Sequence, residues 1–297
     1  MQTIGPFGSW WVSLLWLGGL AATLLWMTRR KLVSPGPYNP WERCLYAPAY
    51  TLARLLWRVE IRWDPRWKDI SSHPTNASFR DVLRERVRGG AVLIANHRSS
   101  VDPFFIQLAA GARVHWMVAA EYFPHPLFGP LLKSYQAIPT RRGGADNGAT
   151  KLAIRYASQG GFVGMFPEGR INRTASPLLT IRPGAALVAA KSDVPLIPIW
   201  IEGAPIGPEV YSALFLPAKV CVTVGFPVHR PNGNLPAPEP MLALDAPLED
   251  PNAESGLTKL TRAKHLHWIE EAMNASLHLG NRSEEKVSFA GKGWVED

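Results

Sequence analysis

Cysteine is scarce in this 297-residue sequence, which contains only Cys44 and Cys221. The two residues lie far apart and form no C-x-x-C pair, so neither a disulfide framework nor a thiolate metal site is expected. This scarcity favours a reducing compartment. The sequence also lacks a G-x-S-x-G nucleophile elbow, which argues against a serine hydrolase of the α/β type. It has no recognised nucleic-acid-binding motif.

Charge is sparse and mostly positive. Charged residues make up 19% of the chain and hydrophobic residues 46%, which excludes a disordered protein. The formal net charge of +8 fits an anionic partner, such as nucleic acid, a phosphate-bearing metabolite or an anionic membrane surface. The twelve tryptophans favour the membrane among these, because amphipathic rings concentrate at bilayer interfaces.

Residues 9–27 form one long run without any charged side chain. As a helix this run spans about 28 Å, enough to cross the hydrocarbon layer. Arg29, Arg30 and Lys31 follow it directly, so the positive-inside rule places the rest of the chain in the cytoplasm. A cleaved signal peptide is the alternative, but it needs a basic region first, and residues 1–8 contain no lysine or arginine. We therefore expect a membrane anchor helix in residues 1–33.

Residues 34–64 predict a linker followed by an amphipathic membrane-surface helix. A Pro/Gly-rich stretch comes first, and apolar residues then recur with near-helical spacing from Trp41 to Trp57. Arg54, Arg58 and Arg62 recur at every fourth position, as in a basic helix lying on a bilayer. A core helix with a charged outer face fits this pattern equally well. The alternation over residues 59–63 is also typical of a strand.

Residues 65–279 predict an α/β domain with a mixed, mainly parallel sheet flanked by helices, because strand-like and helix-like segments alternate. The expected strands are residues 91–95, 114–119, 162–166, 195–201 and 219–225; the expected helices are 104–110, 146–159, 184–191 and 257–279. Pro198 places its strand near an edge or bulge. His265 and His267 are expected on the surface of the last helix. Residues 280–297 are expected to form a flexible tail.

The domain is organised around residues 91–103, with the sequence AVLIANHRSSVDP. A buried strand delivers His97 to its end, and Pro103 suits the first turn of the helix that follows. His97 and Asp102 would lie about 140° apart on an ideal helix, so they meet only if the turn folds one back toward the other. Such a pair suits a general base oriented by a carboxylate. A histidine that merely caps a turn fits the pair equally well in isolation.

A second strand end carries further charged groups. Glu168, Arg170 and Arg173 follow the strand at 162–166, and Arg141 and Arg142 precede it. Ligands of open α/β sheets sit outside the carboxyl ends of strands, so these groups are expected to face one cleft. Guanidinium groups grip phosphates bidentately. Base, orienting acid and phosphate clamp together predict group transfer onto the hydroxyl of a phosphorylated alcohol. A structural ion pair for the glutamate and solvated arginines are the alternatives.

Four motifs resemble those of the glycerolipid acyltransferases, the lysophosphatidic acid acyltransferase family. The first, N-H-x-x-x-x-D-P, runs from Asn96 to Pro103. The second is AIPTRR at residues 137–142, the third FPEG at 166–169 and the fourth VPLIP at 194–198. Because these four blocks occur in the family's order, over roughly residues 45–227, the resemblance is specific.

The resemblance implies a membrane-bound O-acyltransferase with its catalytic domain on the cytoplasmic side of the cell membrane. His97 would deprotonate the hydroxyl of a lysophospholipid, which then attacks the acyl thioester of acyl-CoA or acyl-ACP. Asp102 would orient the imidazole, Arg142 would bind the acceptor phosphate, and Glu168 with Gly169 would shape the acceptor site. The resemblance implies neither a metal nor another cofactor.

The sequence departs from the family at two places. The third motif commonly continues Thr-Arg-Ser, whereas this chain continues with Arg170, Ile171, Asn172 and Arg173. Arg141 replaces the acidic residue that usually precedes the arginine of the second motif. Acceptors other than lysophosphatidic acid, or a catalytically silent basic membrane scaffold, therefore stay open. The candidate substrate-binding residues are Arg141, Arg142, Glu168, Gly169, Arg170 and Arg173.

Overall fold

The computed structural model describes residues 55–70, 89–110, 112–126, 128–141, 146–207, 212–231 and 256–289. Within these ranges no helix has both the length and the apolar character needed to cross a bilayer. The anchor helix expected in residues 1–33 lies outside the described residues and stays a prediction. Arg142 lies outside them as well.

The described residues form a seven-stranded sheet with the order β1-β7-β6-β2-β5-β3-β4. Every neighbouring pair is parallel except β6 and β7, which confirms the predicted mixed, mainly parallel sheet. The strands are β1 (Glu60–Trp63), β2 (Ala91–Ala95), β3 (Val114–Ala119), β4 (Ile138–Thr140), β5 (Phe162–Met165), β6 (Leu196–Glu202) and β7 (Cys221–Val224).

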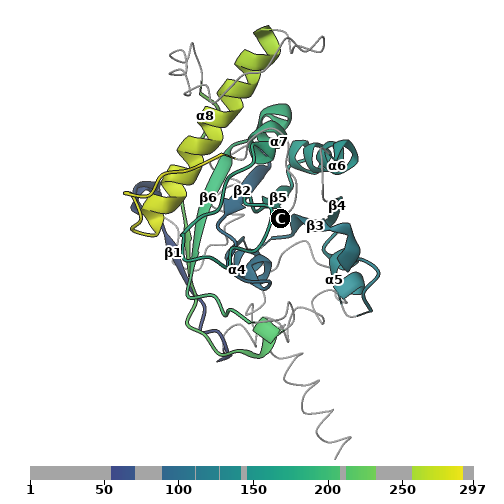
Figure 1. Ribbon diagram of the computed structural model, residues 1–297, viewed down its shortest axis with the longest axis vertical. Coiled ribbons are helices and arrows are strands. Elements are labelled where there is room, and N and C mark those ends of the chain that lie inside the picture. The colour runs from purple at the N-terminus through teal and green to yellow at the C-terminus, as the bar shows by residue number, and fades with distance from the viewer. Residues whose placement is uncertain are drawn as a thin grey trace, which may run out of the picture.

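Helices cover both faces of this sheet (Figure 1). The α-helices are α4 (Asp102–Ala110), α5 (Phe128–Ser134), α6 (Asn147–Ser158), α7 (Gly184–Ser192) and α8 (Gly256–Leu279). Short 3-10 helices are η1 (Pro65–Ile70), η2 (Ala120–Tyr122) and η3 (Ser212–Phe215). Helix α6 begins as expected, because the side chain of Asp146 accepts a hydrogen bond from the backbone N–H of Ala149.

Two apolar clusters lie on opposite sides of the central strand β2. Leu93 packs into the cluster that contains Phe105 of α4, whereas Val92 and Ile94 pack into the cluster formed with α6, α7 and α8. All five residues of β2 are buried. This burial on both faces explains why the strand reads as a continuous apolar run, and it anchors the turn that follows.

Pro198 does not lie on an edge strand, because β6 is inside the sheet, between β2 and β7. The expectation of a bulge is met instead. Leu196 pairs with Val228 and Ile199 pairs with Val224. Between these pairs, residues 197–198 of β6 lie opposite residues 225–227 of the partner segment, which makes a bulge. Within this bulge the carbonyl of Pro198 accepts a hydrogen bond of 2.8 Å from the N–H of Gly225. The proline's missing donor is therefore accommodated inside the sheet.

The first described segment enters the core without continuing a basic helix. Trp57 is buried, Arg58 adopts a φ of 42°, and Arg62 lies within strand β1. A positive φ interrupts a helix. The arginines at every fourth position therefore do not lie along one face of a helix beyond Trp57.

Helix α8 confirms the closing helix expected at residues 257–279. The surface position expected for His265 is wrong, since this side chain is buried, while that of His267 is exposed. Burial lowers the pKa of His265, and the positive charges of Arg230 and Lys191 act in the same direction.

Candidate active site

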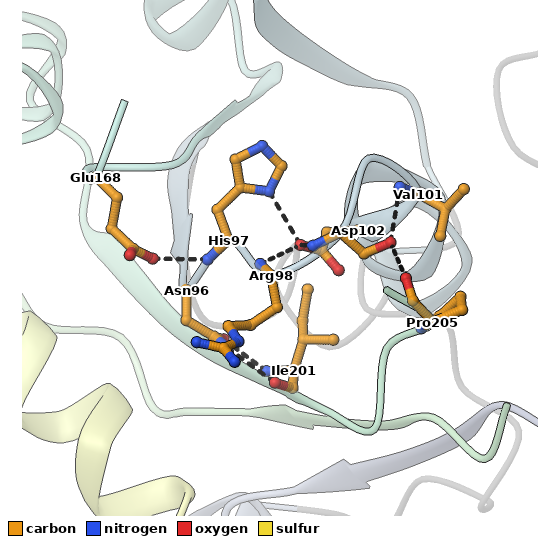
Figure 2. A network of polar contacts seen from close by, with 9 residues as sticks. Asn96, His97, Arg98, Val101, Asp102, Glu168, Ile201 and Pro205 are labelled. Atoms are coloured by element: carbon orange, nitrogen blue, oxygen red, sulfur yellow. Dashed lines mark hydrogen bonds and ion pairs between the residues drawn. The ribbon is translucent and has the colours of Figure 1, made fainter. Parts of the chain in front are cut away.

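The turn after β2 folds His97 back onto the first residue of α4. Nδ1 of His97 lies 2.9 Å from Oδ2 of Asp102 (Figure 2). The two side chains therefore meet across the strand-to-helix turn, as their separation in the sequence required. When the carboxylate oxygen accepts the Nδ1 proton, Nε2 carries the lone pair, which is the tautomer that a general base requires.

The Asp102 carboxylate is fully buried and organises the whole turn. Its Oδ2 also accepts hydrogen bonds of 2.7 Å from the backbone N–H groups of Arg98 and Ser99. Oδ1 is buried as well and has no hydrogen-bond partner among the described residues. Three contacts thus converge on the one oxygen that faces the imidazole, and the N-terminus of α4 adds favourable partial charge.

Glu168 fixes the backbone of the same turn. Its Oε1 accepts a hydrogen bond of 2.7 Å from the N–H of His97, and its Oε2 accepts one of 2.8 Å from the N–H of Leu179. Burial raises the pKa of this carboxyl, although the two N–H donors act in the opposite direction. Glu168 therefore acts on the imidazole through the backbone, which makes it a positioning residue in this geometry.

The rest of the FPEG segment and its continuation complete the enclosure of His97. The N–H of Asn172 donates a hydrogen bond of 2.6 Å to the carbonyl of His97. The ring of Phe166 stacks on the imidazole at a centroid distance of 3.9 Å and an angle of 11°. Gly169 has a φ of 71°, a conformation that favours glycine. The side chain of His97 stays 15% exposed, which leaves the ring open to a substrate.

Asn96 joins the turn to the neighbouring strand β6. Its side-chain amide donates to the carbonyl of Ile201 at 2.9 Å and accepts from the N–H of the same residue at 2.8 Å (Figure 2). Ser99 Oγ donates a hydrogen bond of 2.6 Å to the carbonyl of Pro205, just beyond that strand. These supporting contacts were not predicted, because they depend on β6 being adjacent to β2.

The structure brings only some of the predicted arginines close to this turn. A small surface hollow is lined by Arg98, Arg173, Ser100 and Ile206, among other residues. Arg173 is a predicted site residue, and its guanidinium donates to the carbonyl of Gly207 at 3.2 Å. Arg98, which the sequence reasoning missed, donates to the carbonyls of Thr174 and Ser176. Its position inside the first motif was the available signal.

Arg141 and Arg170 are exposed and do not line this hollow. They nevertheless belong to the same edge of the sheet, because β2, β5, β3 and β4 run parallel and His97, Arg170 and Arg141 all follow strand ends. Three inter-strand steps separate β4 from β2, or about 14 Å. The fold and the turn thus place a histidine–aspartate pair and several basic side chains along one sheet edge, an arrangement suited to base-catalysed group transfer.

Comparisons with known proteins agree with this class. The family model described as Acyltransferase matches residues 76–202. The chain is 30% identical, over 159 residues, to the 1-acyl-sn-glycerol-3-phosphate acyltransferase of Bacillus subtilis (strain 168), covering 52% of this chain and 75% of that protein. It is 29% identical, over 122 residues, to the protein of the same name from Limnanthes douglasii, covering 40% and 43% of the two chains.

A solved structure, the 1-acyl-sn-glycerophosphate (LPA) acyltransferase PlsC from Thermotoga maritima, aligns over 93% of both chains, with a TM-score of 0.46 and 16% identity. The sequence relatives decide the assignment. The chain belongs to the acyltransferase family that includes the 1-acyl-sn-glycerol-3-phosphate acyltransferases, and it is an O-acyltransferase of this type.

Proposed function

We propose that the protein transfers an acyl chain from an acyl thioester, carried by coenzyme A or acyl carrier protein, to the free hydroxyl of a lysophospholipid. The proposed acceptor is lysophosphatidic acid and the product phosphatidic acid. The observation that carries the proposal is the 2.9 Å contact between His97 Nδ1 and Asp102 Oδ2 in a chain of this family.

The chemistry follows from the orientation of the imidazole. Nε2 of His97 takes the proton of the acceptor hydroxyl as its oxygen attacks the thioester carbonyl. Asp102 stabilises the imidazolium that forms, as the carboxylate of a histidine–aspartate pair does in other enzymes. The tetrahedral intermediate collapses with cleavage of the C–S bond. The leaving thiolate then takes the proton from the imidazolium, which restores the neutral base.

The arginines along the sheet edge supply the recognition of the acceptor phosphate. Arg173 beside the hollow, the exposed Arg141 and Arg170, and Arg142 next in the chain are the proposed set. Guanidinium groups bind phosphate oxygens in pairs and keep their charge at every working pH. Because Arg141 adds charge to the second motif, other anionic lyso-lipids are the alternative acceptors.

The lipid acceptor and the charge-free run at residues 9–27 support a further element of the proposal. We propose that residues 1–33 anchor the protein in the cell membrane with the catalytic domain on the cytoplasmic side. Residues 34–64 then connect the anchor to the domain.

The test is acyl transfer by the purified full-length protein in detergent, followed as thiol release and by mass spectrometry of the lipid product. A panel of lyso acceptors is combined with acyl-CoA and acyl-ACP donors. The wild type should form the acylated phospholipid, and His97→Ala should lower kcat by at least about a thousandfold, since general base catalysis is lost.

The matched control is His267→Ala, which removes an exposed histidine from α8 and should leave the rate unchanged. Activity of His97→Ala near that of this control would remove His97 as the base. Absence of acyl transfer by the wild type with every acceptor and donor would overturn the proposed function.

A further inference from the structure

Large apolar side chains are exposed in the connection between β6 and β7. Ile206 is 54% exposed, Phe215 76% and Leu216 37%. Leu55, at the start of the described chain, is 75% exposed. We call these four residues the apolar platform. Exposed apolar residues of this size need a reason when they gather in one region, because folding normally buries them.

Two hydrogen bonds connect three of these residues, because they tie the segment of Leu55 to the segment of Phe215 and Leu216. Nε1 of Trp57 donates a hydrogen bond of 3.1 Å to the carbonyl of Leu216, and the N–H of Ala218 donates one of 3.1 Å to the carbonyl of Leu56. The segment that carries Leu55 is therefore tied to the segment that carries Phe215 and Leu216. Trp57 is itself held in the core by an edge-to-face contact with Phe105 of α4.

The same connection is tied to the active-site turn at its other end. Ser99 donates to the carbonyl of Pro205, and Arg173 donates to the carbonyl of Gly207. Ile206, between these two anchors, lines the hollow together with Arg98, Arg173 and Ser100. Ile206 of the apolar platform therefore lines a hollow beside the turn that carries His97, so that whatever covers this part of the platform lies close to that turn.

Exposed basic side chains, together with the exposed Glu60, occur in the segments that carry these apolar residues. Arg58 and Lys219 are exposed and lie within the two segments that carry the platform. Arg98 and Arg173 line the adjoining hollow. Apolar side chains bordered by lysine and arginine are typical of surfaces that enter the headgroup region of anionic bilayers.

We propose that the apolar platform docks on an anionic bilayer and places Phe215, Leu216, Ile206 and Leu55 at its headgroup–acyl boundary. A lysophospholipid then passes from the membrane toward the turn that carries His97 without crossing water. The inference rests on the proposed function for the identity of this lipid. It adds a second membrane contact, independent of residues 1–33, that sets the orientation of the active site.

The first experiment measures insertion directly and does not depend on activity. Phe215→Cys is introduced into full-length protein that carries Cys44→Ser and Cys221→Ser, and it is labelled with the environment-sensitive fluorophore NBD. Vesicles of phosphatidylcholine and phosphatidylglycerol should shift its emission to the blue, and nitroxide-labelled lipids should quench it. The matched control is a label at Ile61, which is 36% exposed and lies on strand β1, outside the apolar platform.

A label at position 215 that keeps its aqueous emission with vesicles would overturn the inference. So would blue-shifted emission before vesicles are added, which would mean that another part of the chain already covers the platform. Equal quenching at positions 61 and 215 would also overturn it, because contact would then not be specific to the platform.

The second experiment uses the unlabelled double variant Leu55→Ser/Phe215→Ser. With lysophosphatidic acid embedded in the same vesicles, kcat/KM should fall about tenfold, because two exposed apolar contacts with the bilayer are lost. With a short-chain, water-soluble lysophosphatidic acid, kcat/KM should stay at the wild-type value. Ile61→Ser is the matched control and should resemble the wild type with both substrates.

The two assays separate this inference from the proposed function. Equal losses with vesicle-embedded and soluble acceptors would overturn the docking surface while leaving the acyltransferase intact. Insertion of the label at position 215 without acyl transfer by any form of the protein would support the docking surface and overturn the proposed function.

Discussion

His97 and His115 each stack face to face on an aromatic ring, His97 on Phe166 and His115 on Tyr156, with centroids 3.9 Å apart in both pairs. Each also places Nδ1 against an oxygen. For His97 this is the Asp102 carboxylate at 2.9 Å, and for His115 it is the carbonyl of Gln136 at 3.2 Å. A carbonyl can fix the tautomer of an imidazole, but it lacks the full negative charge that stabilises an imidazolium.

The two imidazole rings also differ in how deeply they are buried. His115 is buried within strand β3, and this burial lowers its pKa, with Arg113 acting in the same direction and the Gln136 carbonyl against it. His97 follows the end of β2 and keeps part of its side chain exposed. Stacking on an aromatic ring is therefore a packing arrangement in this fold, which both histidines share. The buried carboxylate and the strand end mark the histidine that is placed for proton transfer.

The largest effect is expected when the negative charge opposite His97 is removed while the shape of the Asp102 side chain is kept. Asp102→Asn should lower kcat by about 10²- to 10⁴-fold, because an amide cannot stabilise the imidazolium. Its oxygen can still accept from the N–H groups of Arg98 and Ser99, but its NH2 group takes the buried position of Oδ1, which has no hydrogen-bond partner among the described residues, so the free energy of unfolding should fall by about 1–3 kcal/mol. Asp193→Asn is the matched control, since Asp193 is exposed and asparagine tolerates its φ of 54°. A loss in kcat of less than tenfold for Asp102→Asn would show that the Asp102 charge does not distinguish His97 from His115.

The next largest effect concerns the support of the His97 turn. Glu168→Gln turns one of two accepting oxygens into a donor, so the N–H of His97 or of Leu179 loses its partner. A buried N–H without a partner costs about 1–3 kcal/mol of folding free energy. We expect a drop in kcat of about tenfold to a hundredfold with little change in KM, because the turn that carries the base is displaced. An altered KM at constant kcat would contradict a positioning role.

The same variant has a defined pH dependence. The pKa of Glu168 is raised in the folded state, so the folded protein binds the proton more tightly than the unfolded chain. Folding stability from this group is therefore lost as the pH rises from the ordinary carboxyl pKa through the raised one. The difference in melting temperature between wild type and Glu168→Gln should therefore become smaller as the pH rises through this range. A difference that widens with pH would show that the carboxyl is stabilised in its charged form.

Much of this architecture could be predicted from periodicity and capping residues. The strand 91–95 reads as a buried apolar run, Asp146 marks the start of α6, and residues 257–279 show one long helix. The contact of His97 with Asp102 could be predicted as a requirement of the turn. These features are local, and each depends on residues a few positions apart.

The order of the strands could not be predicted, and the remaining errors follow from this. Pro198 was expected near an edge or a bulge, and the sequence could not decide between them because it does not show that β7 lies next to β6. His265 was expected on the surface because its burial depends on how α8 packs against distant elements. The two hydrogen bonds that Glu168 accepts, from the N–H groups of His97 and Leu179, depend on β5 lying next to β2. Local pattern therefore located the contact between His97 and Asp102, while the supporting contacts required the sheet.

The smallest expected effect tests the other half of the comparison. His115→Phe keeps a ring that can stack on Tyr156 and removes the hydrogen bond to the carbonyl of Gln136, which costs about 1 kcal/mol of stability at neutral pH. Activity should stay within about twofold of wild type, because this imidazole has no role in proton transfer. A loss comparable to that of Asp102→Asn would contradict the distinction between the two histidines.

The stability of His115→Phe should also differ from that of wild type in its dependence on pH. Because the pKa of His115 is lowered in the folded state, the unfolded chain binds the proton more tightly. The wild type therefore loses stability as the pH falls through the ordinary histidine pKa toward the lowered one, and phenylalanine cannot contribute to this loss. Melting temperatures of the two proteins should converge as the pH falls. If the two melting temperatures changed in parallel with pH, the buried ring would bind its proton as readily in the folded protein as in the unfolded chain. Burial would then not distinguish His115 from His97.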